Sequence, residues 1–153
     1  MAPALPPGAS LPAFKCADAT GGTPGSANVT QIRVVEQLGY DRFVLQFDTK
    51  VPSYSVKRQA KPIFKNGASG ASVTLNGTVG ALVAVHSATM AGTYNGTTDF
   101  THPEFQVLSE ARVTEDFEGY LFWGFGLSRP ACLRTFTLSD PPRLVVDFKT
   151  ASG

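Results

Sequence analysis

The side chains that could support catalysis or metal binding are few and lie far apart in this chain. The two histidines, His86 and His102, have no acidic residue at the H-x-x-E or H-E-x-x-H spacing of zinc sites. A serine nucleophile would need a histidine oriented by an acid, and no G-x-S-x-G elbow is present. Asp116 and Glu118 share one predicted turn, where a solvated acidic loop is expected rather than a glycosidase pair. The sequence therefore predicts a protein that is not an enzyme, with no metal and no cofactor.

Aromatic and guanidinium groups near the ends of predicted strands are better suited to binding a ligand. Aromatic faces offer flat apolar surfaces to sugars, and arginine clasps carboxylates or phosphates with two donors. Pro52 predicts that the strand carrying Tyr54 lies at a sheet edge. We expect a binding site along one exposed sheet face or edge near the loop 87–103. The candidate ligand-binding residues are Arg42, Tyr54, Tyr94, Asn95, Asp99, His102 and Arg143.

Some of these side chains also allow a structural interpretation. Arg42 and Arg143 each follow an aspartate closely and could brace the start of a strand instead of contacting a ligand. Trp123 alternates with Leu121 and Phe125, so it either fills the core or offers a platform to a sugar. The sequence leaves both alternatives open.

Cys16 and Cys132 are the only cysteines, and their spacing excludes a C-x-x-C metal motif. A disulfide between them would close a loop of more than a hundred residues, which stabilises a fold by about 4–5 kcal/mol in the chain-entropy model. It would also pin an N-terminal segment with little apolar mass to the body. We expect this disulfide, with two independent thiols as the alternative, and hence an extracytoplasmic protein.

Length and composition favour a single all-β domain. The chain has 153 residues, a net charge of +1 and a pI of about 7.8, which gives no electrostatic reason to expect nucleic acid as a partner. No apolar run approaches the 18 residues of a transmembrane helix. Short β-branched and aromatic runs separated by turn residues predict a two-sheet β-sandwich of eight or nine strands. We divide the chain into a Pro/Gly-rich arm or linker, residues 1–28, and a β-sandwich domain, residues 29–150.

The predicted strands follow from alternation and turn residues. Two hairpins are expected, one over 29–47 and one over 73–86 with its turn at Asn76-Gly77. The strand 120–126 is apolar on both faces, so it must be central and covered on both sides, or covered on one side by a loop or ligand. The other expected strands are 51–56, 105–115, 132–138 and 143–148.

One strand phrase occurs twice. Residues 42–47 read RFVLQF and residues 143–148 read RLVVDF, with Arg, Val and Phe at equivalent positions. If the repeat is more than coincidence, it suggests two related sheets packed face to face, with these strands in equivalent positions.

The segment FEGYLFWGFGLSRPACLRTFTLSDPPRLVVDF, together with GYDRFVLQFD upstream, resembles the AMIN-like domain of actinobacterial secreted proteins and lipoproteins. The combination of Trp-Gly-x-Gly-Leu with Asp-Pro-Pro-Arg carries most of this resemblance, which spans about residues 38 to 148. This family is related to the AMIN domain that targets cell-wall amidases and secretins. The resemblance implies a β-sandwich that binds peptidoglycan or a nearby envelope component.

The expected function is therefore a non-catalytic cell-envelope binding module that recognises peptidoglycan or an associated wall glycan. Met1-Ala2-Pro3 lacks the features of a signal peptide, so secretion or lipid anchoring would depend on a segment outside this sequence. A protein–protein adaptor at the cell surface is the main alternative. A hydrolase with an unrecognised site and a carrier of a small apolar ligand also remain open.

Overall fold

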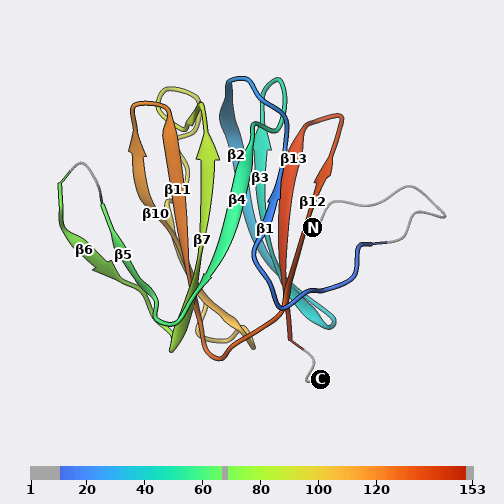
Figure 1. The fold of residues 1–153 in the computed structure, drawn as a ribbon, viewed down its shortest axis with the longest axis vertical. Helices are drawn as coiled ribbons and strands as arrows, with labels where there is room; N and C mark the ends of the chain where they lie inside the picture. Colours follow the sequence, from blue (N-terminus) through green and yellow to red (C-terminus); the bar gives the residue numbers. More distant parts are fainter. Residues whose placement is uncertain (1–10, 67–68, 151–153) are drawn as a thin grey trace.

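The computed structural model describes residues 11–66 and 69–150, and these residues form two sheets packed as a sandwich (Figure 1). The six-stranded sheet has the order β1 (Ala19–Gly21), β4 (Tyr54–Gln59), β7 (Val79–His86), β11 (Tyr120–Leu127), β10 (Leu108–Phe117) and β9 (Asp99–Thr101). The five-stranded sheet has the order β12 (Leu133–Leu138), β13 (Arg143–Lys149), β3 (Tyr40–Phe47), β2 (Ala27–Gln37) and β8 (Ala88–Thr89). A separate hairpin joins β5 (Ile63–Lys65) to β6 (Ser72–Thr74).

The predicted all-β sandwich is confirmed. The eight longest strands in the described part of the chain have six to eleven residues and make the body of the two sheets. Over the same residues no segment is helical, and none of the chain described forms a helix able to cross a membrane.

Alternation along each long strand places one set of side chains between the sheets. On β3, Phe43 points inward and contacts the Trp123 and Phe125 rings of β11 at centroid distances of 5.2 and 4.8 Å. All three side chains are fully buried. Such aromatic pairs add to the free energy gained by burying apolar area, so the core joins the two sheets firmly.

The two similar strand phrases lie in the same sheet, so the expectation that they occupy equivalent positions of two sheets is wrong. β13 pairs antiparallel with β3, with Asp147 opposite Arg42 and Arg143 opposite Gln46. Both strands bury alternate apolar residues, and this pattern determines which face of a strand is covered. It does not determine which strand lies beside it.

The prediction that Tyr54 lies on an edge strand is also wrong, because β1 pairs with β4 on the side away from β7. The N-terminal arm supplies β1, so the described part of the arm belongs to the body of the fold. Lys15 pairs with Leu133, and Cys16 forms a disulfide with Cys132, as expected from the sequence. Residues 1–10 of the predicted arm lie outside the described residues.

The hairpin expected over 73–86 does not form. β6 pairs with β5, whereas β7 pairs with β4 and β11 in the six-stranded sheet. The hairpin over 29–47 does form, as β2 and β3. In the loop 87–103, β8 and β9 are edge strands of the two different sheets, so this segment connects the sheets along one side of the sandwich.

The β5–β6 hairpin packs on the outer face of the six-stranded sheet, where β11 has glycines. A Cβ on Gly126 would lie 1.8 Å from the carbonyl oxygen of Asn76, and one on Gly124 would lie 2.9 Å from the Phe64 ring. The Trp-Gly-x-Gly run therefore has inward-facing bulky residues and outward-facing glycines that admit a second layer. This arrangement confirms that the β11 strand is central and covered on both sides over this half of its length.

Candidate functional site

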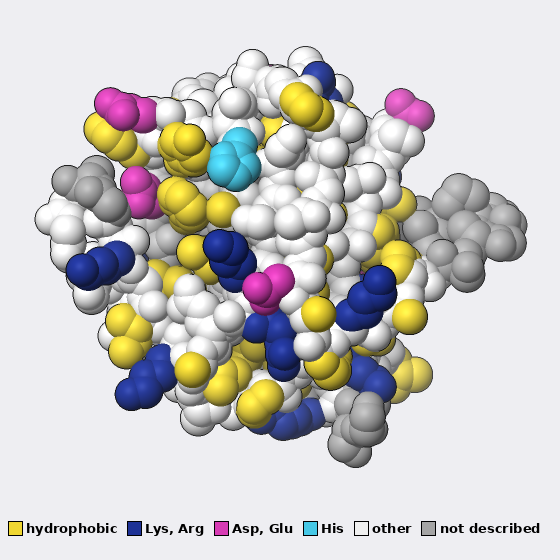
Figure 2. Space-filling view, viewed as in Figure 1, with side chains coloured by type: hydrophobic (Ala, Val, Ile, Leu, Met, Phe, Trp, Pro, Cys, Tyr) yellow, Lys and Arg dark blue, Asp and Glu magenta, His cyan; other side chains and the backbone are white. Residues whose placement is uncertain are grey.

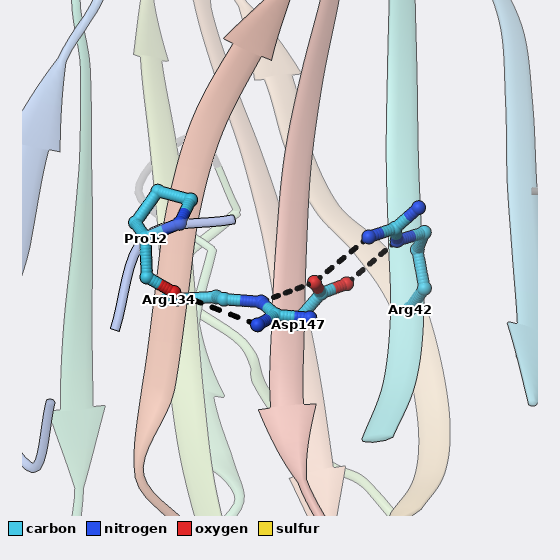
Figure 3. A network of polar contacts seen from close by, with 4 residues as sticks. All are labelled: Pro12, Arg42, Arg134 and Asp147. Carbon is cyan, nitrogen blue, oxygen red and sulfur yellow. Dashed lines mark hydrogen bonds and ion pairs between the residues drawn. The ribbon is translucent and has the colours of Figure 1, made fainter. Parts of the chain in front are cut away.

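The most extensive buried polar network lies on the outward side of the five-stranded sheet (Figure 3). Arg42 Nε donates to Asp147 Oδ1 at 2.8 Å, and Arg42 Nη2 donates to Asp147 Oδ2 at 3.0 Å. Arg134 Nε, on the other neighbouring strand, donates to the same Oδ2 at 2.7 Å. The side chain of Asp147 is fully buried and the two arginines are nearly so. One carboxylate thus holds two guanidinium groups.

Aromatic rings line the two guanidinium groups. The Tyr40 ring lies 4.6 Å from Arg134 Cζ and 5.0 Å from Arg42 Cζ, so it contacts both. Phe14, from the N-terminal arm, lies 4.2 Å from Arg134. Burial acts to lower the pKa of Arg42, but the hydrogen bonds and charge of Asp147 outweigh it and raise the pKa above its ordinary value. The network is a charge-assisted brace between three strands.

Arg42 is therefore not on an exposed sheet face, and the expectation of exposure is wrong. Its geometry matches the structural alternative, although its partner is Asp147 and not the preceding aspartate. That residue, Asp41, instead accepts hydrogen bonds from the backbone amides of Val107 and Leu108, both at 2.9 Å. The polar residues of this β3 face predict contact with solvent, but the Arg42 side chain instead contacts Asp147 and the rings of Tyr40 and Phe136.

Tyr54 and Arg143 also make contacts within the protein. Tyr54 is buried between the sheets, and its hydroxyl donates to Thr135 Oγ1 at 3.2 Å. Arg143 is half-buried and donates to the carbonyl oxygens of Pro141 and Ser139. These two residues lie in different sheets, and neither is in the loop 87–103.

The remaining candidates from the sequence lie at the β8–β9 side of the sandwich. Tyr94 is partly buried, which raises its pKa, and its hydroxyl donates to the Thr97 carbonyl at 2.6 Å. Asn95 and Asp99 are exposed. His102 stacks on Phe105 at 4.3 Å between ring centroids, with Nδ1 at 2.9 Å from Glu104 Oε2. The seven candidates therefore occupy separate parts of the fold instead of one surface.

A different cluster is exposed on the outer face of the six-stranded sheet. Side chains on β11 alternate, so Tyr120 and Phe122 point outward whereas Leu121 and Trp123 point into the core. The fully buried Trp123 thus fills the core, in agreement with the structural alternative. We call His86, Phe117, Tyr120 and Phe122 the aromatic shelf. Cross-strand pairing places Tyr120 between Phe117 of β10 and His86 of β7.

The rings of the aromatic shelf are ordered relative to one another. Tyr120 and Phe122 are nearly parallel, with an interplanar angle of 10° and centroids 6.3 Å apart. His86 meets the Tyr120 ring edge to face at 5.3 Å. Tyr120 is 48% exposed and Phe117 49%. In Figure 2, hydrophobic side chains gather beside a histidine over the upper ends of β10, β11 and β7.

A pocket of about 120 Å³ adjoins the shelf where the β5–β6 hairpin covers the sheet. Its floor includes Leu82 and Phe122, and the hairpin contributes Ile63, Phe64 and Lys65. Gln59 and Glu115 add polar groups at its border. The shelf and this pocket together offer aromatic faces next to hydrogen-bonding and charged groups.

Tyr120, Phe122 and Phe117 are not among the candidate residues that the sequence indicates. The alternation Tyr120-x-Phe122-x-Gly124-x-Gly126 holds the relevant signal. It shows one strand face that changes from aromatic to glycine, which would have indicated a half-covered sheet. Over residues 11–66 and 69–150, no three His, Cys, Asp or Glu side chains are arranged to hold a metal ion.

Comparison with known proteins agrees with the fold and with the resemblance of the sequence. No curated protein gives a significant match to the chain. The intramolecular disulfide in an all-β domain is typical of an extracytoplasmic protein. Residues 27–150, most of the chain, match the AMIN-like domain, and the protein therefore belongs to the AMIN-like family, whose members are related to cell-wall targeting modules.

Proposed function

We propose that this domain is a non-catalytic module that binds peptidoglycan or an associated wall glycan through the aromatic shelf. The module would act outside the cytoplasm, in a secreted or lipid-anchored protein. Family membership supports an envelope ligand, and no catalytic family matches the chain. The observation that carries the proposal is the pair of parallel rings formed by the exposed Tyr120 and the half-buried Phe122.

Parallel rings on one strand suit a sugar polymer for a physical reason. The C–H faces of pyranose rings are apolar and flat, and they stack on aromatic faces while their hydroxyls remain hydrated. A sheet holds the two rings at a fixed spacing, so little side-chain entropy is lost when a ligand binds. An exposed apolar patch with a polar border is the usual character of an interaction surface.

The polar groups next to the shelf would orient a bound sugar through hydrogen bonds. Lys65 at the adjoining pocket can donate hydrogen bonds to hydroxyl or N-acetyl oxygens. Gln59 Nε2 already donates to the carbonyl oxygens of Lys61 and Ile63, so this side chain would offer its Oε1 as an acceptor to a sugar hydroxyl. Asn95, Asp99 and His102 remain proposed secondary contacts, at the β9 side of the same sheet. Tyr94, Arg42, Tyr54 and Arg143 make contacts within the protein, so direct ligand contact through them is not favoured.

Retention on insoluble peptidoglycan, with and without its attached wall polymers, tests the proposal. We expect Tyr120→Ala and Phe122→Ala each to weaken retention roughly tenfold, which corresponds to about 1.4 kcal/mol of binding free energy. Leu38→Ala is the matched control, because Leu38 is 99% exposed on the β2–β3 turn and lies outside the shelf. Equal retention of the shelf variants and the control would refute the shelf as the binding surface.

The protein–protein adaptor remains the alternative, because Ile63, Phe117 and Tyr120 are large apolar side chains exposed on this domain. An adaptor would be retained by envelope protein and not by purified glycan strands. Retention on glycan strands that carry no protein and no stem peptide therefore separates the two functions.

A further inference from the structure

The free edge of β12 carries unpaired backbone groups and is a candidate binding surface separate from the aromatic shelf. β12 is the terminal strand of the five-stranded sheet, and among the described strands of that sheet its neighbour is β13. The amide and carbonyl of Leu133 point away from β13, because they exchange hydrogen bonds of 2.9 and 2.7 Å with Lys15. Backbone groups alternate along a strand, so Thr135 and Thr137 present theirs to the same free side. Within the described part of the chain, these groups have no backbone partner beyond β12.

The pairing of Lys15 with Leu133 shows what this edge accepts. The arm runs beside β12, and Lys15 of the arm makes two antiparallel hydrogen bonds with Leu133, the first residue of β12. The remaining residues of β12 continue the same edge without that partner. The strand has no proline and no exposed charge of its own to prevent further pairing.

Two pockets lie beside the unpaired part of this edge. One, of about 330 Å³, is lined by Leu133, Arg134 and Thr135 on β12 and by residues 17–20 at the β1 side. The other, of about 310 Å³, is lined by Thr137, Leu138 and Ser139 and by Gly22 and Thr23 beyond β1. Strand addition uses backbone pairing for affinity and pockets for alternate side chains, and both are present here.

The charge around these pockets favours acidic side chains. Lys15 and Arg134 line the first pocket, and Lys50 lines the second. Asp18 is the acidic residue in the two linings, and its carboxylate accepts a hydrogen bond from the Arg58 amide at 2.8 Å. Figure 2 shows Lys and Arg side chains gathered over β4 and β1 with an acidic side chain among them. Arg134 is nearly buried and paired with Asp147, so Lys15 and Lys50 supply the positive charge that a ligand at these pockets can reach.

We propose that the β12 edge binds an extended acidic segment of another envelope protein by antiparallel strand addition. The glycan-binding shelf lies on the outer face of the other sheet, so both ligands could bind at once. The domain would then hold a protein partner against the wall. Peptide binding at the β12 edge does not depend on the proposed glycan binding, because it concerns different residues, whereas the attachment of the partner to the wall rests on it.

A capped heptapeptide of alternating Glu and Val is the probe, with a Lys/Val peptide as its charge-reversed counterpart. We expect the acidic peptide to shift the amide resonances of Thr135 and Thr137 and to slow their hydrogen exchange at least tenfold. Binding should weaken as salt rises, because Lys15 is exposed and Lys50 is partly so. The Lys/Val peptide should bind at least tenfold more weakly.

Thr137→Pro removes one amide that faces the free edge and leaves the β12–β13 hydrogen bonds in place. It should weaken acidic-peptide binding at least tenfold, whereas Thr137→Val, which keeps the amide, should bind as the wild type does. A peptide with N-methyl groups on the residues facing β12 removes the same bonds from the ligand side. It tests the proposal with unaltered protein if the proline variant does not fold.

Three outcomes would overturn the proposal. Equal binding of the acidic and basic peptides would remove the charge argument. Undiminished binding of the N-methylated peptide would exclude strand pairing. Protection of Thr135 and Thr137 in a concentration-dependent dimer without peptide would assign the edge to a second copy of this chain.

Discussion

Arg42 and Asp147 lie directly opposite each other on adjacent strands, joined by two hydrogen bonds in a pair that solvent barely reaches. Arg42 begins one of the two similar strand phrases, and Asp147 stands near the end of the other. Antiparallel pairing therefore brings the arginine of one phrase to the acid of its partner. Arg143, the arginine of the other phrase, lies opposite Gln46, so the ion pair forms at one end of the two strands alone.

This pairing predicts the order in which substitutions destabilise the protein. Breaking a buried pair costs about 3–5 kcal/mol. Arg42→Ala should fall at the lower end of this range, because Asp147 keeps its ion pair with Arg134. Asp147→Asn should fall at the upper end, because two buried guanidinium groups lose their charge partner. Urea unfolding measures both. Arg143→Ala, at the matching position of the other phrase, is the control and should cost about 1 kcal/mol or less.

The same Arg42→Ala variant also separates a structural role from ligand contact. Folded Arg42→Ala protein should bind peptidoglycan as the wild type does, because the guanidinium is buried. An unchanged free energy of unfolding together with lost retention would contradict the brace and restore Arg42 as a ligand contact.

Two glycines of β11 predict how strongly alanine substitutions on the outer face of the sheet destabilise the protein. Gly126→Ala should destabilise by about 1–3 kcal/mol, because its Cβ would meet the backbone carbonyl of Asn76. Gly124→Ala should cost less, because its Cβ would meet the Phe64 ring and the Thr114 methyl group at 2.9–3.0 Å, and a side chain can shift. Thermal unfolding compares them. Equal effects would show that the Leu75–Asn76 backbone moves as easily as the Phe64 side chain.

The sequence predicted individual strands better than their neighbours. Alternation identified β3, β11 and β13, because each buries one face and the side-chain period is two. It could not assign β6 to β5 or place β1 beside β4, because partner choice depends on long-range register. A strand that ends near a turn such as Asn76-Gly77 looks the same whether it folds back on its neighbour or crosses to another layer.

The candidate site was harder to predict for a related reason. A polar strand face has the same sequence pattern whether it meets water or a covering segment. The sequence predicts an exposed Arg42, because nothing near this residue in the chain reveals Asp147, Arg134 or the arm residue Phe14. The sequence does not single out Tyr120 and Phe122, because a strand that is apolar on both faces does not show which face stays open.

The disulfide predicts how the N-terminal arm behaves on reduction. Cys16 and Cys132 are 116 residues apart, so reduction should lower the free energy of unfolding by about 4–5 kcal/mol in the chain-entropy model. Protease should cut first within residues 11–18, because beyond the disulfide Lys15–Leu133 is the main backbone pairing that holds this segment. The double variant Cys16→Ser/Cys132→Ser is the control. Its free energy of unfolding should match that of the reduced protein and should not change when reductant is added. Protease cleavage that begins outside residues 11–18 would contradict this role of the disulfide.

Glu110 predicts a pH dependence at the β9–β10 edge. Burial and the neighbouring Asp99 side chain raise the pKa of Glu110 above its ordinary value of 4.5, although the Asn76 amide donates to Glu110 Oε1 at 2.9 Å and acts in the opposite direction. The folded protein thus binds this proton more tightly than the unfolded chain does. The associated stability is fully present below the ordinary pKa and is lost as pH rises through the raised value.

Replacing Glu110 by its neutral isostere isolates this effect from other carboxyl groups such as Asp48, whose pKa is lowered by the Asn28 amide. Glu110→Gln should match the wild type near pH 4, since both side chains are then neutral and can accept from Asn76. It should be more stable than the wild type at pH 7, where Glu110 is ionised beside Asp99. Asp99→Asn should lower the pKa of Glu110 in an NMR titration and reduce the same difference. The ion pair between Asp99 and Arg112 is exposed, with its atoms 4.0 Å apart, so losing it should change the stability little. Urea unfolding from pH 4 to 7 measures the stabilities, and parallel profiles for wild type and Glu110→Gln would show that the Glu110 carboxyl titrates alike in both states.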